Sequence, residues 1–145
     1  MIPAGRLLLD TNCLVYLLEG TSGPEHHYMV RLYQAAASGD AELLASAVSL
    51  AELLVGVARR GSRADVGRAP RAFPRLPGLS LWPVDIAVAS EGALVRERTS
   101  LGLFDALIVA TGVVHGADAL LSNDRQLSRA RAGPSSAQPG AWPPG

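Results

Sequence analysis

The stretch RLLLDTNCLV, at residues 6–15, decides the fold that this sequence predicts. Residues 6–10 carry three consecutive leucines and indicate a short buried strand that ends in the carboxylate of Asp10. Residues 12–19 have a helical pattern, which Gly20 ends. Functional groups of parallel α/β sheets gather at the carboxyl ends of the strands, so Asp10 is the first candidate for a functional residue.

The remainder of the chain alternates between strand and helix patterns. Further strands are expected at residues 42–47, 79–84 and 119–122. Further helices are expected at residues 24–38, 49–60, 85–99 and 104–115. This alternation predicts one α/β domain with a mostly parallel sheet over residues 1–132. Residues 133–145 hold four of the ten prolines and no charge, so we expect a disordered or loosely docked tail there.

Composition narrows the possible function classes. The chain has 145 residues and is 48% hydrophobic, which is enough for one domain with a real core. All thirteen basic residues are arginines, so the lysine of a Walker A phosphate loop or of a Schiff-base enzyme is missing. The single cysteine, Cys13, excludes an internal disulfide and any multi-cysteine zinc or iron–sulfur site. With no targeting signal or membrane-spanning stretch, a soluble cytoplasmic protein is expected.

Four carboxylates stand at strand ends or in the first turns of expected helices: Asp10, Glu52, Asp105 and Asp124. For three of them a structural interpretation stays open. Asp10 and Asp124 suit helix N-caps, and Glu52 fits either a capping box with Ser49 or a solvated helix face. Asp85 and Asp118 are expected to be structural, as a helix cap and a turn residue.

Asp105 favours a functional role more strongly. It is the only charge in LFDALIVATGVV, residues 103–114. A place in the first turn of a helix stabilises a negative charge by only ~0.3–1 kcal/mol. Burying an unpaired carboxylate costs several times as much, so a cation or a hydrogen-bond donor is expected beside Asp105.

If the four carboxylates converge, they require a counter-charge. At ~5 Å and an effective dielectric constant near 20, each pair repels by about 3 kcal/mol, and four charges make six pairs. The total, near ~20 kcal/mol, exceeds the stability of a typical domain. An all-oxygen acidic site suits Mg²⁺ or Mn²⁺ rather than zinc, and magnesium keeps waters that can attack a phosphorus centre.

Four motifs, in the same order along the chain, resemble the PIN domain and specifically the VapC-type toxins of bacterial toxin–antitoxin pairs. They are LLLDTN at 7–12, SLAELLVG at 49–56, LFDALIVATG at 103–112 and ADALLSND at 117–124. The resemblance covers about residues 6–127, and its acidic positions are 42, 53 and 19 residues apart. It implies an acidic quartet of catalytic and metal-binding residues, supported by two hydroxyl side chains. The quartet is Asp10, Glu52, Asp105 and Asp124, and the hydroxyl residues are Thr11 and Ser122, which replaces the more common threonine.

The resemblance also implies a fold and an activity. The fold would be a three-layer α/β/α domain with a mostly parallel four- or five-stranded sheet. The activity would be Mg²⁺- or Mn²⁺-dependent hydrolysis of RNA phosphodiester bonds by an endoribonuclease. The resemblance further implies silencing by a VapB-type antitoxin, a homodimer and no membrane partner. After Leu127 the family's last strand pattern is missing, so the fifth strand stays open. The alternative function is a non-catalytic PIN-like scaffold that binds RNA or a partner.

Two other enzyme classes fit the first strand poorly. A haloacid-dehalogenase-type phosphatase needs a second aspartate two residues after the first, where this chain has Asn12. A dinucleotide-binding fold needs a glycine-rich turn after the first strand, and DTNCLV has none.

Residues 59–75 hold six arginines against one acid, Asp65, although the whole chain has no net charge. A polyanionic substrate of an acidic site needs local positive charge, so Arg63, Arg68 and Arg71 are candidate RNA-binding residues. A solvated loop, or a surface for the antitoxin or a second subunit, is the alternative interpretation of this segment.

Overall fold

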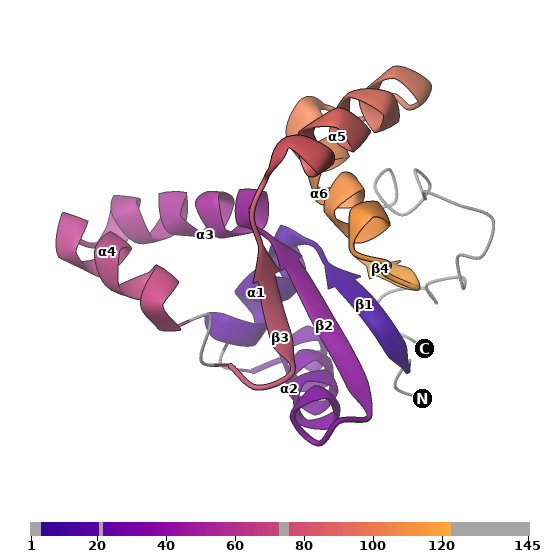
Figure 1. Ribbon diagram of the computed structural model, residues 1–145. Coiled ribbons are helices and arrows are strands. Elements are labelled where there is room, and N and C mark those ends of the chain that lie inside the picture. Colours follow the sequence, from indigo (N-terminus) through magenta and orange to yellow (C-terminus); the bar gives the residue numbers. More distant parts are fainter. Residues whose placement is uncertain (1–3, 21, 73–75, 123–145) are drawn as a thin grey trace.

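The computed structural model describes residues 4–20, 22–72 and 76–122 (Figure 1). The strands are β1 (Gly5–Leu9), β2 (Ala41–Ser46), β3 (Leu79–Trp82) and β4 (Ala119–Leu121). The helices are α1 (Thr11–Leu18), α2 (Pro24–Ala37), α3 (Ala47–Arg60), α4 (Arg63–Ala72), α5 (Ile86–Arg98) and α6 (Leu103–Val114). The strands form one parallel sheet in the order β3-β2-β1-β4. Within the described residues, none of the helices combines the length and the hydropathy needed to span a bilayer.

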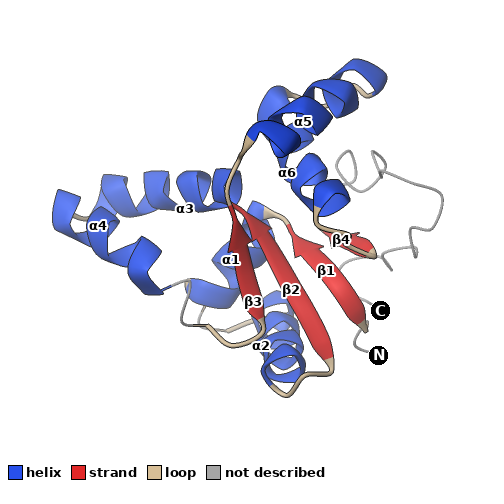
Figure 2. Ribbon diagram, viewed as in Figure 1, coloured by secondary structure: helices blue, strands red, loops and turns tan. Residues whose placement is uncertain are grey.

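Helices cover both faces of the sheet (Figure 2). Leu7 and Leu9 of β1 pack in one core cluster with residues of α1 and α2, whereas Leu8 packs in a second cluster with residues of α5 and α6. Successive side chains of a strand point to opposite faces, so an unbroken leucine run is needed where both faces are covered. The predicted three-layer α/β/α architecture with a parallel sheet is confirmed, with four strands in the described residues. Whether a fifth strand exists, and where the domain gives way to a tail, falls on residues outside the described ranges.

The expected strands and helices all form, with small shifts at their ends. One helix was not expected. α4 occupies the arginine-rich segment, so the interpretation of that segment as a loop is wrong. Its start is a capping box, in which Asp65 accepts from the backbone N–H of Ser62 at 2.9 Å and Ser62 Oγ accepts from the backbone N–H of Asp65 at 3.4 Å. Gly67 and Pro70, both poor helix formers, hide this helix in the sequence.

The strand order reverses between β1 and β4. From β1 the chain adds β2 and then β3 on one side, and only β4 lies on the other side of β1. Ligands of open α/β sheets bind outside the carboxyl ends of the strands at such a reversal, which here lies between β1 and β4.

Arg6 fixes the opposite, amino edge of the sheet. Its backbone N–H donates to Asp118 at 2.8 Å, and its guanidinium donates to Glu42 at 2.6 Å and to the His115 carbonyl at 2.7 Å. The C-terminal end of α6 therefore lies toward the amino edge. Because α6 also contacts β1, β2 and α3, its first turn, with Asp105, lies toward the carboxyl edge.

Candidate active site at the carboxyl edge of the sheet

Asp10 directly follows β1, beside the end of β4, and is buried, with 4% of its surface exposed. Oδ1 accepts from the backbone N–H of Cys13 at 2.9 Å, and Oδ2 accepts from the hydroxyl of Ser122. The Asp10 backbone N–H donates to the Leu121 carbonyl at 3.2 Å. A buried carboxylate is stable only where donors compensate its lost hydration, and here both oxygens have one.

The sheet register explains why Ser122 meets Asp10. Leu9 of β1 is paired with Leu121 of β4, so the next residue of each strand lies at the same level. Asp10 and Ser122 are 112 residues apart in sequence and become neighbours only through this pairing. The structure thus brings together one quartet residue and one of the predicted hydroxyl residues.

Glu52 joins the site from α3. Its carboxylate is exposed, and Oε1 accepts from the hydroxyl of Thr11 at 3.0 Å. Thr11 directly follows Asp10 and begins α1. The second predicted hydroxyl residue therefore links the first two acids of the quartet.

The capping-box interpretation of Glu52 is wrong. α3 begins at Ala47, and its N-cap is Ser46, whose hydroxyl accepts from the backbone N–H of Val48 at 3.1 Å. Ser49 lies inside the helix and is fully buried, so it is not the N-cap residue with which Glu52 could form a capping box. Sequence analysis missed Ser46, although a serine at the end of an expected strand is a usual helix start.

Asp105 lies in the first turn of α6, after the N-cap residue Gly102, and is half-buried. Its neighbours Leu103 and Phe104 are exposed, so α6 is not buried on all sides although it is apolar on all sides. Asp124 lies outside the described residues. Among the described residues, no group of three or more His, Cys, Asp or Glu side chains is placed to hold a metal ion. The convergence of the full quartet stays a prediction.

Cys13 is a core residue beside the site, as expected. Its thiol is fully buried and donates to the Leu121 carbonyl at 3.3 Å. Burial raises the pKa of the Cys13 thiol well above its ordinary value, and the negative charge of Asp10 raises this pKa further. A neutral buried thiol is not a nucleophile, which leaves the chemistry to the oxygen groups.

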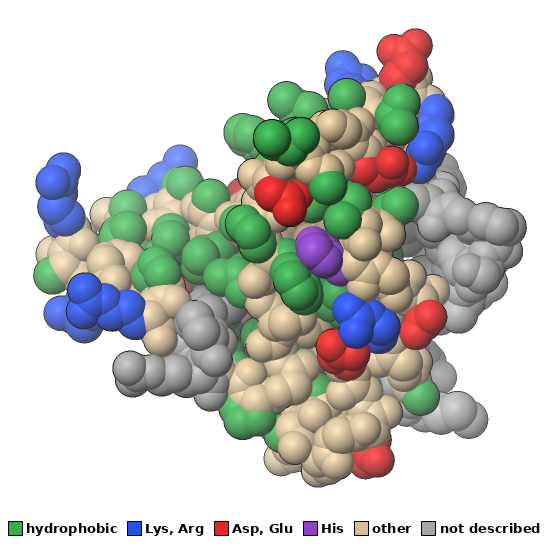
Figure 3. Space-filling model, viewed as in Figure 1, with side chains coloured by type: hydrophobic (Ala, Val, Ile, Leu, Met, Phe, Trp, Pro, Cys, Tyr) green, Lys and Arg blue, Asp and Glu red, His purple; other side chains and the backbone are tan. Residues whose placement is uncertain are grey.

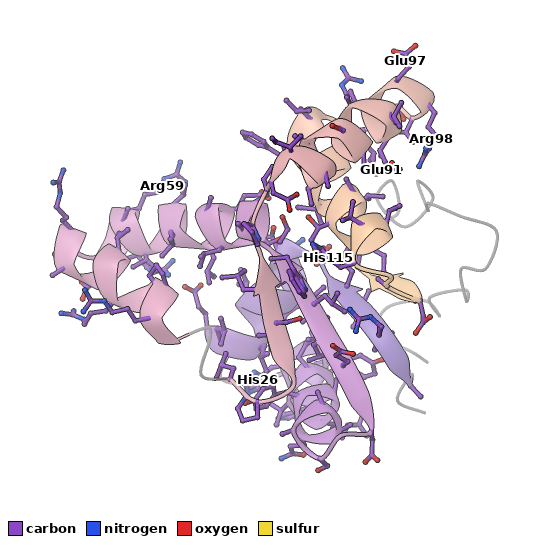
Figure 4. All side chains as sticks on the ribbon, viewed as in Figure 1. His26, Arg59, Glu91, Glu97, Arg98 and His115 are labelled. Carbon is purple, nitrogen blue, oxygen red and sulfur yellow. The ribbon has the colours of Figure 1, made fainter. Side chains whose placement is uncertain are left out.

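The remaining candidates are placed as follows. Asp85 caps α5, accepting from the backbone N–H of Val88 at 2.9 Å, which confirms its structural role. Asp118 pairs with the backbone of Arg6, also as a structural residue. His115 ends α6, is partly exposed and stacks on Trp82 with ring centroids 3.9 Å apart (Figure 4). Of the three candidate arginines, Arg68 pairs with Asp65, and all three lie exposed on α4.

Comparisons with known proteins agree with this architecture. The family model of the PIN domain matches residues 7–133. Among proteins with curated functions, none is significantly similar in sequence to this chain. Solved structures that share the fold include the following three. The structure of VapBC2 from Rickettsia felis, bound to a DNA fragment from their promoter, has 18% identity and a TM-score of 0.62, covering 86% of this chain and 92% of that chain.

The second is FitAcB from Neisseria gonorrhoeae, with 23% identity and a TM-score of 0.63, covering 86% of this chain and 91% of that chain. The third is VapC20 from Mycobacterium tuberculosis, described as a toxin that cleaves the sarcin–ricin loop. It has 20% identity and a TM-score of 0.63, covering 86% of this chain and 94% of that chain. At these identities the likeness establishes a shared fold.

Proposed function

Because this chain belongs to the PIN domain family, we propose that it is a divalent-metal-dependent endoribonuclease that hydrolyses RNA phosphodiester bonds. The observation that supports the proposal most directly is the position of Asp10. It is a buried carboxylate at the reversal point of a parallel sheet, held by Ser122 and next in sequence to Thr11, which binds Glu52. A second candidate function is a non-catalytic scaffold of the same fold that only binds RNA or a partner.

The donor set suits a hard divalent cation. Asp10 and Glu52 offer carboxylate oxygens, and Thr11 and Ser122 offer hydroxyl oxygens. The Cys13 thiol beside Asp10 is buried, and burial raises its pKa well above its ordinary value, so it is a poor metal ligand. Oxygen ligands of this kind favour Mg²⁺ or Mn²⁺. We propose that Asp105 and Asp124 complete the set, because they hold the matching positions of the family's motifs.

Each side chain has a distinct role in this proposal. A bound divalent cation would neutralise the carboxylates and act as a Lewis acid toward the phosphate. Asp10 and Asp105 would hold it most directly, with Ser122 and the Cys13 backbone N–H keeping Asp10 in place. Glu52, oriented by Thr11, and Asp124 would orient the attacking water.

We further propose that the protein acts as the toxin of a VapBC-type pair. VapBC2 and VapC20 share its fold over nearly their whole length. A VapB-type antitoxin would cover the carboxylates of the proposed site, with a guanidinium as a fitting partner for them. The protein would form a homodimer and work in the cytoplasm, where its RNA substrate is found.

The direct test is cleavage of a labelled single-stranded RNA by the purified protein. Cleavage should need Mg²⁺ or Mn²⁺ and stop with a chelator. In ¹⁸O-enriched water the product phosphate should gain one ¹⁸O, because water is the nucleophile. RNA binding without cleavage at any metal concentration would favour the scaffold instead.

A further inference from the structure

α3 and α4 form an arm that projects from the sheet, and positive side chains gather on it (Figure 3). This arm is called the arginine arm because it carries five exposed arginines: Arg59, Arg60, Arg63, Arg68 and Arg71. Residues 59–72 have a net charge of +4 in a chain whose net charge is zero. The positive charge is therefore local to one end of α3 and to α4.

Two of these five arginines are neutralised by neighbours. Arg60 pairs with Glu19 at the end of α1, and Arg68 pairs with Asp65. Asp65 is partly exposed, and its pKa is lowered chiefly by the hydrogen bond from the Ser62 backbone N–H, so it remains ionised beside Arg68 at neutral pH.

The other three arginines keep their charge available. Within the described part of the chain, Arg59, Arg63 and Arg71 have no acidic partner within ion-pair distance. An exposed guanidinium without a carboxylate partner can bind phosphate through two parallel hydrogen bonds. These three residues are the part of the arm that can receive a polyanion.

Arg59 is aligned with the proposed active site along α3. It follows Glu52 by seven residues, which is two helical turns to within ~20°. Both residues therefore lie on one side of the helix, separated by about 10 Å along its axis. Between them, Val55 and Gly56 bring no charge to that side. Figure 4 shows Arg59 projecting from α3 away from the sheet. A stacked strand rises ~3.4 Å per nucleotide, so about three nucleotides span this distance.

We propose that Arg59, Arg63 and Arg71 form a track that binds the phosphates of single-stranded RNA about three or more nucleotides from the scissile bond. This inference rests on the proposed ribonuclease function. The carboxylates of the proposed site repel a polyanion, and the overall charge of zero supplies no long-range attraction. The arginine arm supplies attraction at the distance where the repulsion has weakened.

The test compares two double variants with the same change of charge. Arg59→Gln/Arg63→Gln alters the arm. Arg31→Gln/Arg96→Gln removes two exposed arginines of α2 and α5 that also lack an acidic partner among the described residues. Binding of a 20-nucleotide single-stranded RNA is measured across salt concentrations, in an Asp105→Asn background that prevents cleavage.

The arm variant should lower the slope of log affinity against log salt by about 1.4, at ~0.7 per lost contact, and weaken binding about tenfold at ~0.15 M salt. The control variant should leave the slope unchanged. An unchanged slope in the arm variant, or an equal loss in the control, would overturn the inference.

Cleavage separates this inference from the proposed function. With Asp105 restored, the arm variant should lower kcat/KM for the 20-nucleotide RNA and leave kcat/KM for a trinucleotide, too short to reach Arg59, unchanged. Equal losses on both substrates would contradict the track. If the unaltered protein cleaves neither RNA, the proposed function fails, while the binding slopes still decide whether the arm holds RNA.

Discussion

Asp10 uses its two carboxylate oxygens for two different tasks. Oδ1 caps α1 through the Cys13 backbone N–H, and Oδ2 accepts from Ser122. The sequence offered a helix cap and a functional acid as alternatives for this residue. The two interpretations are compatible, because a carboxylate oxygen that accepts one hydrogen bond keeps a lone pair that can bind a cation. Fixing a carboxylate through hydrogen bonds is a way to hold a ligand-binding group in position.

Ser122→Ala should destabilise the protein by about 1–3 kcal/mol, because a buried carboxylate loses one of its donors. Ser122→Thr keeps the hydroxyl and should retain most of the stability. The free energy of unfolding in urea measures both effects. The control is Ser90→Ala, which removes an exposed hydroxyl that donates only within α5. If Ser122→Ala matches the control, Asp10 does not depend on this hydrogen bond.

Thr11→Val should lower kcat/KM for RNA about 10- to 100-fold, because Glu52 loses the hydroxyl that orients it. The free energy of unfolding should change little, since Glu52 is exposed. Thr11→Ser preserves the donor and should restore most of the activity. Equal activity of the valine and serine variants would show that this hydrogen bond does not orient Glu52.

At the scale of helices and strands, prediction from sequence worked best where the apolar pattern is long. The leucine runs of β1 and β2 identify strands buried on both faces. Boundaries that depend on one cap were harder to locate. Ser46 and Ser49 both precede apolar residues by suitable distances, and Ser49 is excluded as the cap because α3 already begins at Ala47.

α4 depends on its capping box, and we expect its stability to depend on pH. The hydrogen bond from Ser62 lowers the pKa of Asp65, so the ionised carboxylate favours the folded helix. This stabilisation is present above the ordinary carboxyl pKa of about 3.9 and is lost as the pH falls through the lowered pKa of Asp65.

Hydrogen-exchange protection of α4 measures this effect, with α2 as the internal reference. Protection of α4 relative to α2 should be highest near neutral pH and fall in acid. Asp65→Ala should give the low protection at every pH. If the protection of α4 relative to α2 changes with neither pH nor the Asp65→Ala substitution, the capping box does not stabilise α4.

For the whole molecule, topology brings the candidate residues toward one edge of the sheet. The order β3-β2-β1-β4 places the ends of β1 and β4 side by side, and α6 brings Asp105 toward the same edge. Sequence alone predicted the parallel sheet and the acidic residues, because both leave local patterns. The Asp10–Ser122 and Thr11–Glu52 contacts could not be read from periodicity, since each joins segments at least 41 residues apart through strand pairing and helix packing.

The central claim is that the carboxylates of this edge perform metal-dependent RNA hydrolysis, and Asp105→Asn tests it most directly. Asp40→Asn, an exposed carboxylate in the turn before β2, is the matched control. The rate of RNA cleavage by each protein is measured with saturating Mg²⁺ or Mn²⁺. Asp105→Asn should lose at least about 10²-fold in rate, while its free energy of unfolding stays equal or rises as repulsion is relieved. Asp40→Asn should match the unaltered protein. Near-normal cleavage by folded Asp105→Asn would contradict the claim.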